Sequence, residues 1–104
     1  MSTDVVDVPA RSRYEVTVDG ELAGFAEYRR VEGATVFTHT EVFDAYEGKG
    51  VGSALARGAL DHVRSEGRKL VAQCPFIAAF LRRHVEDADL VDTELTARLA
   101  SRSR

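Results

Sequence analysis

The spacing of apolar residues changes once along this chain, at a stretch with three alternating glycines, Gly48, Gly50 and Gly52. Before this stretch, apolar and polar residues alternate in several runs, which is the period of a β-strand. After it, apolar residues recur at the spacing of one helical face, beginning at Val51. Strands first, and then a helix between strands, predict a mixed α/β (α+β) fold.

The first half predicts three antiparallel strands joined by tight turns. The alternating runs cover residues 13–18, 21–31 and 34–43. Asp19-Gly20 and Glu32-Gly33 lie between them, and Asp-Gly favours a two-residue hairpin turn because both positions favour positive φ. Gly24 and the small residues beside it also suit a bulge in the second strand.

The second half predicts a helix, a strand and a second helix. The first helix begins at Val51, and Gly67 ends it in the usual left-handed conformation. A strand over residues 69–74 follows, and Pro75 starts a helix over residues 75–84. A helix between two strands implies a right-handed crossover and a parallel pair of strands.

The length allows one domain with looser ends. With 104 residues, the chain can bury one hydrophobic core but not two. We expect residues 1–12 to form a flexible segment, because they show no clear strand or helix period. Residues 92–104 are expected to form a short helix around Leu95 and Leu99 or a frayed tail.

Charge and composition argue against several classes of protein. The net charge is -3, whereas general nucleic-acid binders usually carry a basic excess, so we expect no nucleic-acid partner. No window approaches the roughly 20 apolar residues of a transmembrane helix, and the N-terminus lacks a secretory signal pattern. The single cysteine, Cys74, cannot form an internal disulfide and fits a reducing compartment. We therefore expect a cytoplasmic monomer or small homo-oligomer with no membrane partner.

The alternating glycines suit an anion-binding loop at a helix start. The first turn of a helix leaves several N–H groups without partners, and the helix dipole adds partial positive charge there. Glycines let an anion, most often a phosphate, approach these groups closely. Lys49 would add a cation and Ser53 a hydroxyl donor. The alternative is that the glycines serve only a tight turn or a mobile connector.

Two common nucleotide-binding loops do not match these glycines. A P-loop requires Gly-Lys-Ser or Gly-Lys-Thr, and neither occurs in the chain. The dinucleotide fingerprint G-x-G-x-x-G requires its third glycine one residue later than Gly52. It also requires an acidic residue after the next strand, where Gln73 and Cys74 stand. Both nucleotide interpretations are therefore weakened.

The segment "EGKGVGSAL" resembles the acetyl-CoA diphosphate loop of the GCN5-related N-acetyltransferases, whose pattern is Gln/Arg-x-x-Gly-x-Gly/Ala. The flanking segments "HTEV" and "CPFIAAFLRRH" resemble the small branch of that superfamily, with chains of about 100 residues. The resemblance covers residues 13–91 and implies a minimal acetyl-CoA-binding domain. The implied sheet is mixed: an antiparallel meander, then a β-α-β unit splayed around acetyl-CoA, then a second helix.

The chain departs from the superfamily pattern in three ways, one of which is Val85, where this branch usually has Pro after "RRH". Glu47 stands where the superfamily has Gln or Arg. An acid beside a diphosphate is unfavourable unless its side chain points away, so we expect only the backbone N–H of Glu47 to help. The helices that larger relatives insert between their first two strands are missing, because Asp19-Gly20 closes the hairpin directly. We therefore expect an open acceptor site.

The resemblance also implies which residues bind the cofactor. Val42 and Phe43 would lie beside the pantetheine arm, which pairs with the backbone of the third strand. Phe76 would border the arm, and Arg83 would reach a CoA phosphate, although a solvated basic helix face would explain Arg83 equally well. The residues implied to hold the diphosphate through backbone N–H groups are Glu47, Gly48, Lys49, Gly50, Val51, Gly52 and Ser53.

Three residues are candidates for the chemistry, which the resemblance implies to be direct attack of an amine on the thioester. His39 and Glu41 share a face of the third strand, and either could take the amine proton, unless His39 is only structural. Cys74 would lie at the thioester. It could accept the acetyl group, protonate the leaving CoA thiolate, or be a small buried apolar residue. A backbone N–H near Val42 would stabilise the oxyanion. We expect no metal site.

The sequence thus predicts an acetyl-CoA-dependent N-acetyltransferase that moves an acetyl group to an amine on a protein or a small molecule. One alternative is a non-catalytic sensor that binds acetyl-CoA or CoA. The other is an α/β interaction domain whose glycines serve only turns.

Overall fold

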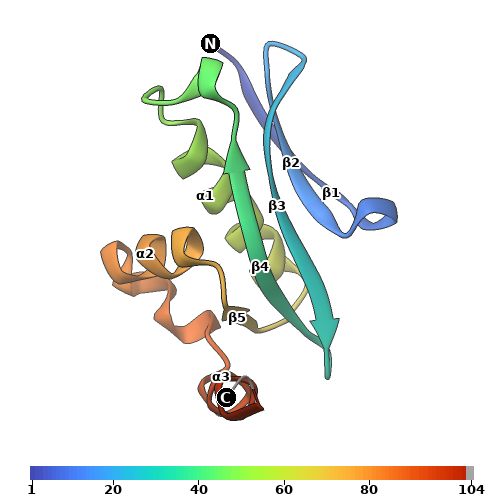
Figure 1. The fold of residues 1–104 in the computed structure, drawn as a ribbon, viewed down its shortest axis with the longest axis vertical. Helices are drawn as coiled ribbons and strands as arrows, with labels where there is room; N and C mark the ends of the chain where they lie inside the picture. Colours follow the sequence, from blue (N-terminus) through green and yellow to red (C-terminus); the bar gives the residue numbers. More distant parts are fainter. Residues whose placement is uncertain (103–104) are drawn as a thin grey trace.

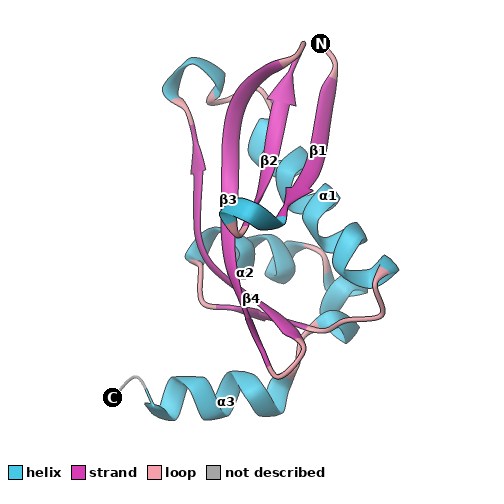
Figure 2. Ribbon diagram, turned by 90° about the vertical axis from the view of Figure 1, so that its right-hand side faces the viewer, coloured by secondary structure: helices cyan, strands magenta, loops and turns pink. Residues whose placement is uncertain are grey.

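Five strands lie side by side in chain order, β1-β2-β3-β4-β5, and helices cover both faces of the sheet (Figures 1 and 2). The computed structural model describes residues 1–102. The strands are β1 (Thr3–Val8), β2 (Arg13–Val18), β3 (Glu21–Val31), β4 (Ala34–Val42) and β5 (Leu70–Ala72). The helices are η1 (Pro9–Arg11), η2 (Asp44–Tyr46), α1 (Val51–Ser65), α2 (Pro75–Arg83), η3 (Val85–Leu90) and α3 (Thr93–Arg102).

The expected hairpin turns are confirmed. Asp19 and Gly20, between β2 and β3, have φ values of 49° and 86°. Glu32 and Gly33, between β3 and β4, have φ values of 52° and 82°. Positive φ at both central residues matches the twist of the flanking strands, so each turn joins its strands directly. The left-handed helix end is also confirmed, since Gly67 has a φ of 68°.

The expectation of a flexible N-terminal segment is wrong for β1, which pairs antiparallel with β2 along its whole length. Its run "TDVVDV" does not alternate, so no strand period marks it. Its partners lie far away in the sequence. Val5 packs against Gly58 of α1, and Asp7 accepts a 2.6 Å hydrogen bond from the Tyr28 hydroxyl. These distant contacts, rather than local pattern, define the strand.

The core lies mainly between the sheet and α1. Apolar residues of α1 and α2 pack with inward-facing residues of β2 to β4, including Tyr14 and Phe37. The helix α3 packs on the other face, where Leu95 and Leu99 contact residues of β4 and β5. The expected C-terminal helix around these two leucines is therefore confirmed, while the expected fraying would fall on residues 103–104, outside the described residues. Figure 2 shows α1 along the strands and α3 below them.

The strands β4 and β5 are parallel but pair over only three residues, from Thr35 to Phe37 on β4. The carbonyl of Phe37 accepts hydrogen bonds from the N–H groups of Gln73 and Cys74, both at 3.0 Å, and the strands then part. The register of β3 against β4 shifts just there, because Thr38 is an extra residue in β4. The expected splayed β-α-β unit is therefore confirmed.

A second register shift lies between β2 and β3, where Val16 and Thr17 oppose Gly24 and Leu22. Ala23 is thus the extra residue, which confirms the expected bulge. Gly24 has no room for a side chain, since a Cβ there would lie 2.5 Å from the Glu41 carbonyl oxygen. Within residues 1–102, none of the helices has the length and hydropathy needed to cross a membrane.

Candidate functional site

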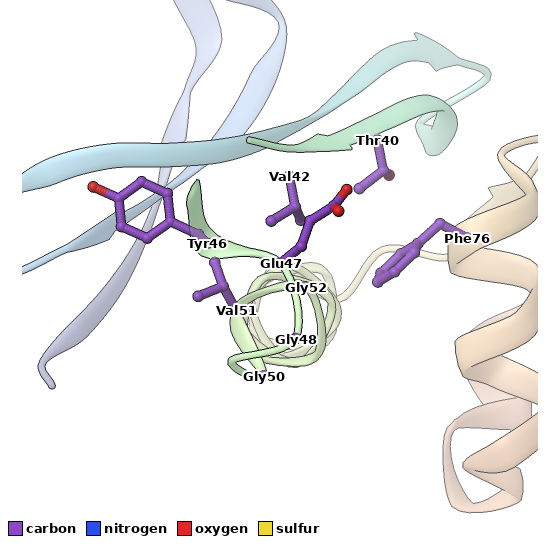
Figure 3. Close-up of a pocket in the computed structure, with 9 residues that line it drawn as sticks. All are labelled: Thr40, Val42, Tyr46, Glu47, Gly48, Gly50, Val51, Gly52 and Phe76. Carbon is purple, nitrogen blue, oxygen red and sulfur yellow. The ribbon is translucent and has the colours of Figure 1, made fainter. Parts of the chain in front are cut away.

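A pocket of about 390 Å³ opens where β4 ends, between the loop before α1 and the start of α2 (Figure 3). Its volume is in the range of small-molecule sites, about 300–1,000 Å³. The loop and the first turn of α1 form one wall, β4 forms another, and a phenylalanine of α2 closes the third side. The lining residues are Thr40, Val42, Tyr46, Glu47, Gly48, Gly50, Val51, Gly52 and Phe76.

The loop exposes backbone N–H groups at the start of α1. Gly48 and Gly50 both have a φ of 76°, a conformation that residues with a Cβ rarely adopt. Gly50 is the N-cap, and because glycine has no side chain it cannot cap the first-turn N–H groups. The N–H of Ala54 donates to the carbonyl of Gly50 at 3.1 Å. The three N–H groups before Ala54 in the first turn have no acceptor one turn earlier in the helix, so they can bind an anion.

Gly52 brings the aromatic ring of Phe76 against the helix start. A Cβ on Gly52 would lie 2.7 Å from Cζ of Phe76 and 3.5 Å from a methyl group of Val42. Pro75 is the first residue of α2, where its fixed φ suits the helix start, and Phe76 follows it in the first turn. Val42 and Phe76 therefore form two apolar walls next to the exposed amides of the loop.

The free edge of β4 faces this pocket. The N–H of Phe43 donates to the Ala23 carbonyl of β3 at 2.9 Å. Successive N–H groups of a strand point to opposite sides, so the N–H of Val42 points away from β3, toward the gap left by β5. Thr40 and Val42 also direct their side chains into the pocket. An extended ligand could pair with this edge as an added strand.

The structure contradicts both expectations for Glu47, namely that its side chain points away from the pocket and that its backbone N–H is available to a diphosphate. Its side chain points into the pocket toward Thr40, whereas we expected it to point away (Figure 3). Its N–H donates to the Asp44 carbonyl at 3.2 Å, so that group is already used within the protein. The cause is the short helix η2, because Glu47 closes its last turn with an extended backbone that directs the side chain back beneath β4.

Seven of the eleven residues expected to bind a cofactor line the pocket, namely Val42, Glu47, Gly48, Gly50, Val51, Gly52 and Phe76. The other four do not. The Phe43 ring packs on Phe25, with 6.2 Å between the ring centroids, on the opposite face of the sheet. Lys49 and Ser53 have exposed side chains beside the loop, and exposed Arg83 ends α2. The cofactor-binding roles of all eleven residues stay predictions.

Sequence reasoning missed Thr40 and Tyr46 as lining residues. Thr40 lies two residues before Val42 on the same strand, so the period of a strand could have found it. Tyr46 belongs to η2, and no sequence signal had predicted that turn.

The three candidate catalytic residues occupy two different places. Cys74 is buried directly before α2, with its sulfur 3.2 Å from the Thr40 hydroxyl. His39 and Glu41 share one face of β4, as expected, but this is the face opposite the pocket, where Nε2 of His39 lies 3.6 Å from a Glu41 carboxylate oxygen. Both are exposed, and the His39 ring lies 6.1 Å from that of Phe25. His39 therefore faces away from Cys74.

Comparison with known proteins agrees with this fold. The family model for GCN5-related N-acetyl-transferase matches residues 13–90. Protein NATD1 of Homo sapiens and of Bos taurus is 41% identical to the chain over 46 residues, 44% of this chain and 41% of NATD1. The matched part therefore spans less than half the length of these relatives.

Two solved structures are similar in fold. A GCN5-like protein from Staphylococcus aureus, solved by NMR, superposes with a TM-score of 0.65 at 22% identity, covering 85% of this chain and 86% of that one. A ribosomal-protein-alanine N-acetyltransferase from Brucella melitensis biovar Abortus superposes with a TM-score of 0.50 at 27% identity, covering 61% and 50%. The family model covers most of the chain, and the sheet, splay and loop agree with it, so the chain belongs to the GCN5-related N-acetyltransferase family.

Proposed function

We propose that this protein is an N-acetyltransferase that uses acetyl-CoA as acetyl donor and an amine as acceptor. The observation that carries the proposal is that one pocket joins the exposed first-turn amides of α1 to the unpaired edge of β4. A diphosphate suits the amides, and an extended chain containing amide groups suits the strand edge. Family membership supports the same function.

Each part of acetyl-CoA would contact a different part of the pocket. The diphosphate would accept hydrogen bonds from the backbone amides between Gly50 and Ser53, and the pantetheine arm would lie between Val42 and Phe76. The thioester would then reach Thr40, close to the buried thiol of Cys74. Exposed Lys49 and Arg83 are proposed to contact the outer phosphates.

The proposed reaction is direct transfer of the acetyl group. The amine nitrogen attacks the thioester carbonyl carbon, the carbon–sulfur bond breaks, and CoA leaves as a thiolate that takes up a proton. The N–H of Val42 faces the gap and is the proposed donor to the developing oxyanion. The proposed source of the proton for the thiolate is either the thiol of Cys74 or the hydroxyl of Thr40, whose sulfur and oxygen lie 3.2 Å apart.

The acceptor would enter from the face of the sheet that carries His39 and Glu41. A neutral amine is needed for attack, so one of these two side chains would take the proton that the amine loses. The face is open there, since the side chains of His39 and Glu41 are both more than half exposed. An open face suits an amine on a protein or a small molecule. We further propose a cytoplasmic location, which a single free cysteine fits.

A second candidate function is a sensor that binds acetyl-CoA without turning it over. The observation that favours it is that the candidate base His39 and the pocket residue Thr40 point to opposite faces. In that case the pocket would be occupied while no group on the other face assists attack.

Two measurements test the proposal. Acetyl-CoA should raise the melting temperature of the protein, because a ligand that binds only the native state stabilises it. Calorimetry should detect binding of both CoA and acetyl-CoA. Release of CoA thiol with a panel of aliphatic amines and peptides would then separate the enzyme from the sensor. Absence of any heat of binding and of any thermal shift would exclude both functions.

A further inference from the structure

Glu47 is the one charged residue among the nine that line the pocket. Its charge has the same sign as the diphosphate that the loop is proposed to hold. A site for an anion would be expected to carry a cation or to be neutral. The negative charge of Glu47 in this pocket therefore needs a physical explanation.

The position of Glu47 makes the conflict spatial as well as electrostatic. The carboxylate extends between Val42 and Thr40, into the space that lies along the free edge of β4 (Figure 3). Phe76 borders the same space from α2. A chain that pairs with this edge must therefore pass where the carboxylate now lies.

Among residues 1–102, the carboxylate of Glu47 has no partner that neutralises its charge or fixes its position. Within residues 1–102, its oxygens take part in no hydrogen bond or ion pair, while the backbone N–H of Glu47 is fixed to Asp44. Lys49, two residues further on, is exposed and does not line the pocket. The side chain is thus free to rotate out, but in the structure it occupies the pocket.

We propose that Glu47 sets the affinity of the site for CoA and its thioesters by weakening it. The carboxylate must leave the edge of β4 before the pantetheine arm can pair there, and its charge then opposes the diphosphate. Weak binding of this kind lets the product CoA leave. The inference rests on the proposed function, since it concerns the same pocket, but it makes a separate prediction about one side chain.

Replacing Glu47 with glutamine isolates the charge, because the two side chains have nearly the same shape. Removing one unit charge near a diphosphate in a solvent-exposed pocket should tighten CoA binding about three- to tenfold. The gain should shrink as ionic strength rises, since salt screens the repulsion. Glu47→Ala removes the obstruction as well and should also tighten binding.

The experiment is calorimetry of CoA binding to the wild type, Glu47→Gln and Glu47→Ala, at low and at near-physiological salt. Glu94→Gln is the matched control, because it removes the same charge from α3, at the far end of the molecule from the loop (Figure 1). Melting temperatures of all four proteins verify folding. We expect tighter binding for both Glu47 variants and unchanged binding for Glu94→Gln.

Each outcome decides the inference. Tighter binding by the Glu47 variants supports it, even where the wild type binds too weakly to measure. Equal or weaker binding by Glu47→Gln with normal wild-type binding overturns it and leaves the proposed function intact. Absence of binding by every variant overturns both this inference and the proposed function.

Discussion

The sulfur of Cys74 lies 3.2 Å from the hydroxyl oxygen of Thr40, at the point where β4 and β5 separate. The thiol is buried and does not line the pocket, whereas Thr40 does. His39, the side chain that could have activated the thiol, points to the other face of the sheet. This arrangement suits a thiol that orients Thr40 better than a nucleophile, which needs access and a nearby base.

We therefore expect Cys74→Ala to change turnover by less than about tenfold, whereas loss of a covalent nucleophile costs several orders of magnitude. Stability should fall by about 1 kcal/mol, for the lost hydrogen bond. Steady-state kinetics and mass spectrometry of the protein quenched in acetyl-CoA check this. Cys74→Ser, which keeps a donor to Thr40, is the control. An acetyl adduct on Cys74, together with an inactive alanine variant, would contradict the prediction.

Substitutions can show whether His39 or Glu41, on the face where the acceptor is proposed to enter, is the general base. We expect His39→Gln to lower kcat about a hundredfold, the usual contribution of a general base, with little change in KM for acetyl-CoA. The KM should hold because His39 lies on the face opposite to the pocket. Glu41→Gln is the matched variant, and a larger loss there would assign the base to Glu41. Full activity of both variants would remove this face from the chemistry.

Gly52 provides a test of binding that leaves stability nearly unchanged. A Cβ there would meet Cζ of Phe76 at 2.7 Å, and that atom is the far end of a side chain that can move. We expect Gly52→Ala to push the ring into the pocket and weaken CoA binding about tenfold, a cost of about 1.4 kcal/mol. Alanine is about 1 kcal/mol better than glycine in a helix, so the melting temperature should not fall.

A second substitution checks the cause. If the ring of Phe76 transmits the effect, Phe76→Leu in the Gly52→Ala background should bind CoA better than Gly52→Ala alone. Binding by Gly52→Ala at wild-type strength, measured by calorimetry, would show that the pocket tolerates a methyl group at this position.

The sequence predicted those parts of the fold that depend on local chemistry. Asp19-Gly20 and Gly67 could be placed at turns because these residue types adopt positive φ at low cost, and they do so in the structure. The helical spacing of apolar residues after Val51 correctly predicted α1. The loop before α1 followed from the same reasoning. The strand β1 was missed because its stability comes from Val5 against Gly58 and from other contacts between residues distant in the sequence.

The details of the site were harder to predict for the same reason. The bulge at Thr38 determines which β4 side chains enter the pocket, and it lies just beyond Phe37, where the pairing of β4 with β5 ends on the other edge. The direction of the Glu47 side chain depends on η2, a turn held by hydrogen bonds within its own short segment. Neither feature leaves a period or a motif in the sequence.

Asp87 should make stability depend on pH on the acid side. This buried carboxylate accepts hydrogen bonds from Arg57 at 2.6 Å and 3.2 Å and from Arg64 at 3.3 Å, which ties η3 to α1. The hydrogen bonds from Arg57 are the main reason why the pKa of Asp87 lies below its ordinary value. The stabilisation is complete above the unfolded-state pKa, about 3.9, and is lost as the pH falls through the lower folded-state pKa.

We expect Asp87→Asn to lower the free energy of unfolding at neutral pH by about 1–3 kcal/mol, because the amide leaves part of the arginine donors unmatched. The loss of stability on acidification should then be shallower than in the wild type. Urea unfolding between pH 3 and pH 7 measures both effects, and exposed Asp4→Asn is the control. Identical acid profiles for Asp87→Asn and the wild type would contradict the assignment.

Gly58 provides the opposite test to Gly52, on the same helix. A Cβ there would lie 2.6 Å from Cβ of Val5 and within 2.9 Å of both of its methyl groups. The first of these atoms is attached directly to the backbone of β1, so the strand itself must move. That displacement typically costs about 1–3 kcal/mol, which exceeds the helix propensity that alanine gains. We therefore expect Gly58→Ala to be less stable than the wild type in urea, with CoA binding unchanged.

The cause is again tested by a compensating change. Val5→Ala removes the two methyl groups that a Cβ at position 58 would meet, so it should cost less stability in the Gly58→Ala background than in the wild type. The difference between these two costs measures the contact in a double-mutant cycle. Additive costs would mean that β1 does not press on α1 at this point, and that the strand is held by its pairing with β2 alone.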